Sequence, residues 1–109
     1  MPEPGDIVVA RFVGAVVTKA RPTLVISSTE YHGVHPDCVL GLITSNLSRA
    51  TTEFDHVIVD WAEVGLDRPS AFRAYLGMAI ARELIPIGRL SERDLPAVRR
   101  CLSGVFDKS

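Results

Sequence analysis

Short apolar runs recur along the chain, and turn-forming residues bound them. Each run is rich in valine, isoleucine and leucine, and proline, glycine, aspartate or asparagine stands near most of its ends. Runs of this length and composition are typical of β-strands. The pattern predicts strands at 6–12, 22–28, 38–45 and 56–61, and it allows a further short strand at 15–18.

The segments between and after these runs are less uniform. We predict a fifth strand at 71–80, although a helix is the alternative because 71–84 contains many good helix formers. The polar stretch 29–37 is predicted to be a loop. The stretch 46–54 is predicted to be a loop or a single helical turn.

The end of the chain has the clearest helical pattern. Ser91 can cap a helix, and Asp94 three residues later makes a variant of the capping box. Pro96 then falls at about the fifth helical position, where its missing N–H removes one hydrogen bond. The apolar positions that recur at helical spacing are Leu95, Val98, Leu102, Val105 and Phe106.

These elements predict a mainly β fold with a C-terminal helix. Short strands followed by one helix within 109 residues favour a single domain over 1–109. The strand spacing predicts a compact antiparallel sheet or a small barrel. The helix is expected to cover one end or one side of it.

Charge and cysteine content bear on the cellular location of the protein and on the kind of ligand that it binds. Twelve basic and thirteen acidic residues leave a net charge of −1. This value neither indicates nor excludes a nucleic-acid partner, because the local field of a cleft matters more for binding than the net charge of the chain. Ten of the twelve cations are arginine, which suits bidentate phosphate contacts. Cys38 and Cys101 fit no disulfide framework, and the acidic start lacks an apolar leader. We therefore expect reduced thiols, a cytoplasmic location and no membrane partner.

Two basic residues directly precede the second predicted strand. Lys19 and Arg21 directly precede an apolar run that begins at Pro22. Arg21 is either a solvated arginine at a sheet edge or part of a site. Thr44 and Ser45 close the next strand, where β-propensity followed by a turn at Asn46 is the simpler explanation. Other arginines that could line a groove, or be ordinary surface charges, are Arg49, Arg68 and Arg73.

The histidine-rich loop and the tryptophan have simple structural explanations. His32, His35, Asp37 and Cys38 are all metal-ligand types, but they lie in one loop with no second group of ligands elsewhere, so we expect no metal site. Nothing in the pattern sets two histidines across a groove for acid–base catalysis. Trp61 follows an apolar strand and favours a core or interface position over base stacking.

Five motifs occur in a fixed order: PGDIV, RPTLVIS, LITSN, GLDRPSAFRA and IGRLS. With these motifs the chain resembles the MazF/PemK-type toxins of bacterial type II toxin–antitoxin systems, from Pro4 to about Leu102. The resemblance implies a small SH3-like β-barrel that works as a homodimeric, metal-independent and cofactor-free endoribonuclease. It also implies cleavage of single-stranded RNA at short sequences, leaving a 2′,3′-cyclic phosphate and a 5′-hydroxyl, and a cognate antitoxin protein as inhibitor.

The resemblance assigns residues as well. The arginine of the family's RP motif matches Arg21, and the threonine of its TS motif matches Thr44, so these two are the expected catalytic residues. The residues expected to contact RNA are Lys19, Ser45, Asn46, Arg49 and Arg73.

The expected chemistry is consistent with these residue types. Attack by a 2′-hydroxyl on its neighbouring phosphate is intramolecular, so the protein must mainly stabilise charge and move protons. A guanidinium fork and a hydroxyl donor are suited to the first task. Many members carry an aspartate soon after the arginine of the PS..R motif, where this chain has Tyr75. Two alternatives remain open: a catalytically inactive member, or a protein-binding member of the same fold that acts like a gyrase poison.

Overall fold

Six strands, two α-helices and two 3₁₀ turns make up the computed structural model, which describes residues 2–11 and 20–107. The strands are β1 (Asp6–Arg11), β2 (Ala20–Val25), β3 (Asp37–Thr44), β4 (Asp55–Val57), β5 (Ala71–Ile80) and β6 (Ile85–Arg89). The helices are α1 (Thr29–Val34) and α2 (Asp94–Val105), and the 3₁₀ turns are η1 (Leu47–Arg49) and η2 (Ala81–Glu83). The strand that the sequence allows at 15–18 lies outside the described residues.

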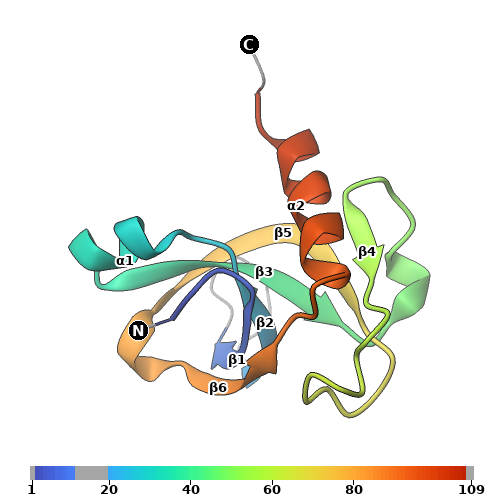
Figure 1. Cartoon of the computed structure of the whole chain (residues 1–109), viewed down its shortest axis with the longest axis horizontal. Helices are drawn as coiled ribbons and strands as arrows, with labels where there is room; N and C mark the ends of the chain where they lie inside the picture. Colours follow the sequence, from blue (N-terminus) through green and yellow to red (C-terminus); the bar gives the residue numbers. More distant parts are fainter. Residues whose placement is uncertain (1, 12–19, 108–109) are drawn as a thin grey trace.

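All six strands belong to one antiparallel sheet with the order β4-β5-β3-β2-β1-β6. The sheet is strongly curled, and β5 arches across it before the chain returns as β6 (Figure 1). In the described part of the chain no ladder joins β4 to β6, so the barrel is open. The expectation of a mainly β, barrel-like fold with a C-terminal helix is confirmed.

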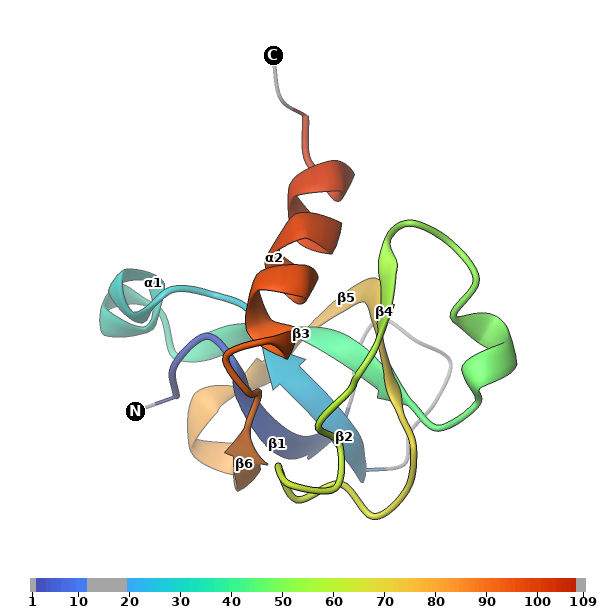
Figure 2. The same ribbon diagram turned by 45° about the vertical axis from the view of Figure 1, so that its right-hand side comes forward.

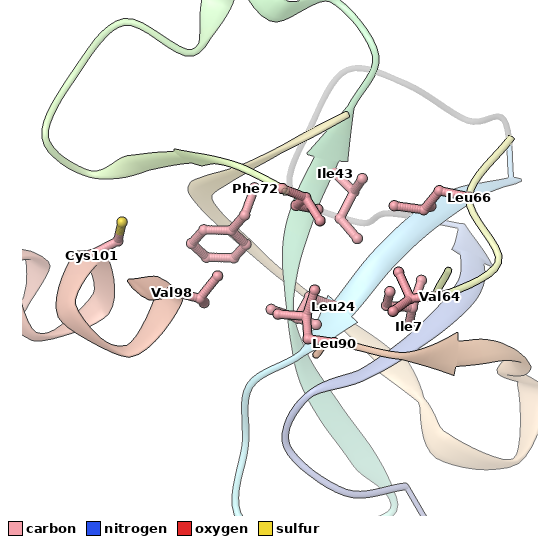
Figure 3. Packing of buried hydrophobic residues seen from close by; sticks show 10 residues of the cluster. Ile7, Leu24, Ile43, Val64, Leu66, Phe72, Leu90, Val98 and Cys101 are labelled. Atoms are coloured by element: carbon pink, nitrogen blue, oxygen red, sulfur yellow. The ribbon is translucent and has the colours of Figure 1, made fainter. Parts of the chain in front are cut away.

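Side-chain alternation divides the core between the two faces of the sheet. On β2, Leu24 belongs to one buried cluster and Val25 to the other, as expected for neighbouring residues of a strand. Figure 3 shows the first cluster, where the ring of Phe72 lies next to Val98 of α2. Val64 belongs to the same cluster, so the helix and the 60–70 loop are both held to this face.

The sequence prediction was right for most strands and wrong for three segments. Residues 71–80 form a strand, as predicted, and the helical alternative is wrong. The predicted loop at 29–37 contains α1, whose first turn is capped by the hydroxyl of Ser28 accepting the N–H of Tyr31. β6 was not predicted, because Pro86 and Gly88 interrupt its pattern; as an edge strand it tolerates a proline.

The third difference concerns the strand predicted at 56–61, which is only the three-residue β4. The N–H of Ile58 still donates to the carbonyl of Ser70, and beyond it the backbone leaves the strand pairing. The N–H groups of Val59 and Asp60 donate instead to the carboxylate of Asp94, at 2.9 Å each. A side chain from another element therefore replaces the strand partner that the apolar pattern suggested.

Asp94 is the point at which α2 is attached. Its side chain is fully buried, and it also accepts a hydrogen bond from Nε2 of His56. Burial alone would raise the pKa of Asp94, but the N–H groups of Asp60 and Val59, together with His56, outweigh it and hold the pKa below its usual range. Every donor around this buried charge is thus used to tie the helix to the 56–60 segment.

The start of the helix follows the capping pattern. The assigned helix α2 begins at Asp94, but the N–H of Leu95 already donates to the carbonyl of Ser91 in the helical manner, and the N–H of Asp94 donates to the hydroxyl of Ser91. Pro96 has no N–H to donate to the next carbonyl, that of Glu92, so it costs one hydrogen bond, as the sequence predicted. Figure 2 shows α2 rising away from the sheet after its first turns. Among the described residues no helix combines the length and apolar character needed to cross a membrane.

We predict that Gly41→Ala destabilises the protein. A Cβ at Gly41 would lie 2.3 Å from the ring of the fully buried Phe72. Such overpacking typically costs about 1–3 kcal/mol. Gly33→Ala is the matched control, because nothing lies within 4 Å of its added Cβ and alanine favours helix. Urea denaturation of both variants measures the difference, and equal stability of Gly41→Ala and wild type would contradict the packing argument.

We also predict that acid weakens the attachment of α2. Hydrogen bonds from Arg93, and then from Ser91, lower the pKa of Asp60 to about 2, and the pKa of Asp94 is lowered as well. Because the unfolded pKa of aspartate is about 3.9, the stabilisation is present above that pH and is lost as the pH falls toward 2. Urea midpoints between pH 5 and pH 2.5 should fall less for Asp60→Asn than for wild type. Glu53→Gln removes an exposed carboxylate and is the control, so its urea midpoint should fall as much as that of wild type.

Candidate functional site

A cavity of about 770 Å³ opens where β2 begins and β3 ends. Six of the seven residues that the sequence proposed for the site line it: Arg21, Thr44, Ser45, Asn46, Arg49 and Arg73. The seventh, Lys19, lies outside the described residues. The structure thus brings together residues from three strands and one loop that the sequence had singled out separately.

The strand register explains how Arg21 and Thr44 meet. Thr23 of β2 faces Leu42 of β3. Arg21 and Thr44 lie two residues beyond this pair on their own strands, so their side chains leave the sheet on the same face. Both line the cavity. The Oγ1 atom of Thr44 accepts the N–H of Asn46 at 3.1 Å, and a hydroxyl that accepts still carries a proton to donate.

Arg21 is half-buried, and its charge is not neutralised by any contact that the structure records. Among residues 2–11 and 20–107, only two buried side-chain nitrogen or oxygen atoms lack a hydrogen-bond partner, and they are Nε of Arg21 and Nε of Arg73. Nε of Arg73 still lies 3.7 Å from the carboxylate of Asp55, so Arg21 is the stronger case. Leaving a buried donor unsatisfied costs stability, so the Nε of Arg21 favours a ligand at this cavity.

Arg73 is held by an acid on the neighbouring strand. It faces Asp55 of β4 in the sheet register, and its Nε lies 3.7 Å from Oδ1 of that carboxylate. The other oxygen of Asp55 accepts from the N–H and the hydroxyl of Thr52, at 3.0 Å each. Asp55 is therefore locked in place and orients Arg73 from behind. Sequence reasoning missed Asp55, because only the register of β4 and β5 pairs it with an arginine.

The cavity is strongly cationic although the chain is nearly neutral. Four arginines line it against one lining acid, Asp67, and Asp55 behind the wall offsets the charge of Arg73, which leaves an excess of two positive charges. Asp67 is itself 88% exposed and lies 3.7 Å from Arg68. Concentrated positive charge in a cleft attracts anions, and arginine forks fit phosphate oxygens. The arrangement is suited to an anionic ligand with more than one phosphate.

The far wall of the cavity comes from the 60–70 loop. Leu66 is buried in the first core cluster, and the hydroxyl of Ser70 donates to the carbonyl of Arg68 at 2.9 Å. The turn requires Gly65, whose φ is +94°. Sequence reasoning weighed Arg68 but missed Leu66, Asp67 and Ser70, because the fold of this segment depends on its contact with the core.

The other candidate residues serve the scaffold. His32 is buried between the hydroxyl of Ser27 and the carbonyl of Pro2, and His35 stacks on Tyr31. None of the histidines lines the cavity, and no group of three or more potential ligands that could hold a metal occurs among the described residues. Trp61 packs against the first core cluster.

The two cysteines are also part of the scaffold. Both Cys38 and Cys101 are free and buried, and burial raises the pKa of each thiol. A thiol with a raised pKa is a poor nucleophile.

Fold and site together define a small, curled antiparallel β protein with a C-terminal helix and an arginine-lined cavity for anions. Comparison with family models identifies the family within this class. Residues 3–106 match the model of the PemK-like, MazF-like toxins of type II toxin–antitoxin systems. The chain belongs to this family. No curated protein matches it significantly in sequence.

Solved structures with the same fold include several of this type. MazE–MazF from Deinococcus radiodurans is 22% identical, with a TM-score of 0.74 over 99% of this chain and 97% of that one. The Mycobacterium tuberculosis toxin MazF-mt6 is 23% identical, with a TM-score of 0.74 over 95% of this chain and 98% of that one. An endoribonuclease in complex with its cognate antitoxin, from a mycobacterial species, is 16% identical, with a TM-score of 0.73 over 95% of this chain and 93% of that one.

Proposed function

We propose that this protein is the toxin of a type II toxin–antitoxin system and acts as a metal-independent, sequence-specific endoribonuclease on single-stranded RNA. The observation that carries the proposal is the position of Arg21 and Thr44, on the same face of adjacent strands in a cavity with an excess of two positive charges. Membership of the MazF-like family supports it, as do similar structures described as endoribonucleases.

The proposed reaction is transesterification within the RNA. The 2′-hydroxyl gives up its proton and attacks the adjacent phosphorus, and the bond from phosphorus to the 5′ oxygen breaks. That oxygen takes up a proton, so the products are a 2′,3′-cyclic phosphate and a 5′-hydroxyl. Because nucleophile and phosphate belong to one substrate, the protein gains most by stabilising the extra charge on the phosphorane.

Arg21 and Thr44 have the groups for this task. The buried Nε of Arg21 has no protein acceptor in the described part of the chain, so it can donate to a non-bridging phosphate oxygen. Thr44 supplies a hydroxyl donor on the same face. A guanidinium has a pKa above about 12, so we assign Arg21 to charge stabilisation rather than to proton abstraction.

The remaining predicted residues would bind the rest of the RNA. Arg49 and Arg73 are suited to neighbouring phosphates, while Ser45 and Asn46 offer exposed polar groups at the rim. Lys19 is proposed to contact RNA from the segment before β2. RNA lying extended over such a rim exposes its bases for sequence recognition, as single-stranded RNA recognition requires.

We further propose that the toxin is a cytoplasmic homodimer that a cognate antitoxin protein inhibits. One of the similar structures is an endoribonuclease in complex with its cognate antitoxin, and another contains MazE and MazF together. An antitoxin that covers the cavity would have to neutralise its arginines, so we expect an acidic inhibitory segment.

We predict that wild type cleaves a long single-stranded RNA in EDTA at defined sequences. Arg21→Ala should lower the cleavage rate roughly 10²- to 10³-fold, as expected for the loss of a charge-stabilising donor. Thr44→Ala should also be slow, whereas Thr44→Ser keeps the hydroxyl and should retain most activity. Arg99→Ala, at an exposed arginine of α2, is the control for loss of one positive charge. Cleavage rates and mapped RNA ends are the measurements.

Each alternative has its own outcome in this experiment. Cleavage that needs added magnesium would refute metal independence. No cleavage by folded wild type, with or without magnesium, would refute the nuclease proposal and favour a protein-binding or inactive member of the fold. Full activity of Arg21→Ala would refute the assignment of that residue.

A further inference from the structure

Tyr75 occupies an irregular position on β5 beside the cavity. Along the ladder with β3, Leu76 faces Gly41 and Arg73 faces Leu42. One step on β3 therefore corresponds to three steps on β5, so Ala74 and Tyr75 are the extra residues of a β-bulge. Bulges occur next to active sites, where they redirect a side chain.

The bulge sets Tyr75 between two hollows of the surface. Tyr75 lines the arginine-rich cavity, and it also lines a smaller hollow of about 150 Å³. Arg73 borders both hollows too. The other walls of the smaller hollow are Thr52, Phe54, Asp55 and Ala74, which combine apolar surface with polar groups.

The side chain of Tyr75 remains accessible in this position. The residue is 43% exposed although it lies in the middle of a long strand. An aromatic ring that stays exposed beside a cationic cavity has the two properties of a single-stranded nucleic-acid site, a flat surface for a base and nearby cations for the backbone.

We propose that Tyr75 forms a nucleobase subsite, in which an unpaired base next to the cleaved phosphate stacks on its ring at the mouth of the smaller hollow. This inference rests on the proposed RNA-cleaving function and adds a base contact to it. Arg73, oriented by Asp55, binds the phosphate of the same nucleotide. The bulge thereby couples one base position to the reacting backbone, and Tyr75 contributes to the choice of RNA sequence.

The test uses a short RNA that contains one mapped cleavage site, and a series in which each flanking nucleotide in turn is replaced by an abasic one. Wild type should cleave one abasic RNA roughly ten- to a hundredfold more slowly at low substrate concentration, because one stacked base is lost. Tyr75→Leu should cleave the intact RNA more slowly than wild type by a similar factor. On that abasic RNA, Tyr75→Leu and wild type should have the same cleavage rate. Tyr75→Phe keeps the ring and should match wild type.

Tyr31→Leu is the matched control, because Tyr31 is the other tyrosine and lies on α1, outside both hollows. It should cleave every RNA as wild type does. Thermal unfolding and size-exclusion chromatography of each variant check folding and oligomeric state.

The outcomes separate this inference from the proposed function. If wild type cleaves no RNA, the proposed function fails and the subsite with it. If wild type cleaves and Tyr75→Leu behaves identically on all substrates, only the subsite is refuted. Equal losses for Tyr75→Phe and Tyr75→Leu would refute stacking, and a change of oligomeric state in Tyr75→Leu would assign the ring to a protein contact instead.

Discussion

Leu42 faces Thr23 of β2 on one side and Arg73 of β5 on the other, and the position of the cavity depends on this row of the sheet. Strands that pair in register present their side chains on a common face, so a shift of β3 by one residue would turn Thr44 to the opposite face. The contact of Phe72 with Gly41 holds this register, since no larger residue fits there. The same contact adjoins the bulge, which links the packing of the core to the shape of the site.

A buried carboxylate supports the site from a distance. Asp94 holds β4, the segment after it and the start of α2 together by accepting three hydrogen bonds, two from backbone N–H groups and one from Nε2 of His56. A buried charge is tolerated only when its hydrogen bonds are made, and removing its partners leaves it strongly destabilising. This segment leads directly into the loop that carries Leu66 and Arg68 to the cavity wall. The attachment of the helix therefore bears on the site without touching it.

The tertiary structure sorts the arginines into two groups with different roles. Arg93 pairs with Asp60, and Arg89 pairs with Asp6, so these cations support the scaffold. Four others meet at the cavity, and only two carboxylates, those of Asp67 and Asp55, lie beside them. Because the cavity gathers more cations than acids, a chain with a net charge of −1 presents a positive cleft. Net charge alone could not have indicated the ligand.

The sequence by itself determined the apolar runs that became most of the strands, the terminal helix, and the motifs that contain Arg21 and Thr44, because these are properties of neighbouring residues. The tertiary structure alone decided that an irregular strand with Pro86 completes one edge of the sheet. It alone set where β4 ends, because the N–H groups of Val59 and Asp60 bond to Asp94 rather than to a strand. It also decided that Asp55 stands behind Arg73 and that Tyr75 lies between two hollows. Register, bulges and long-range hydrogen bonds join residues far apart in the chain, and no local pattern encodes them.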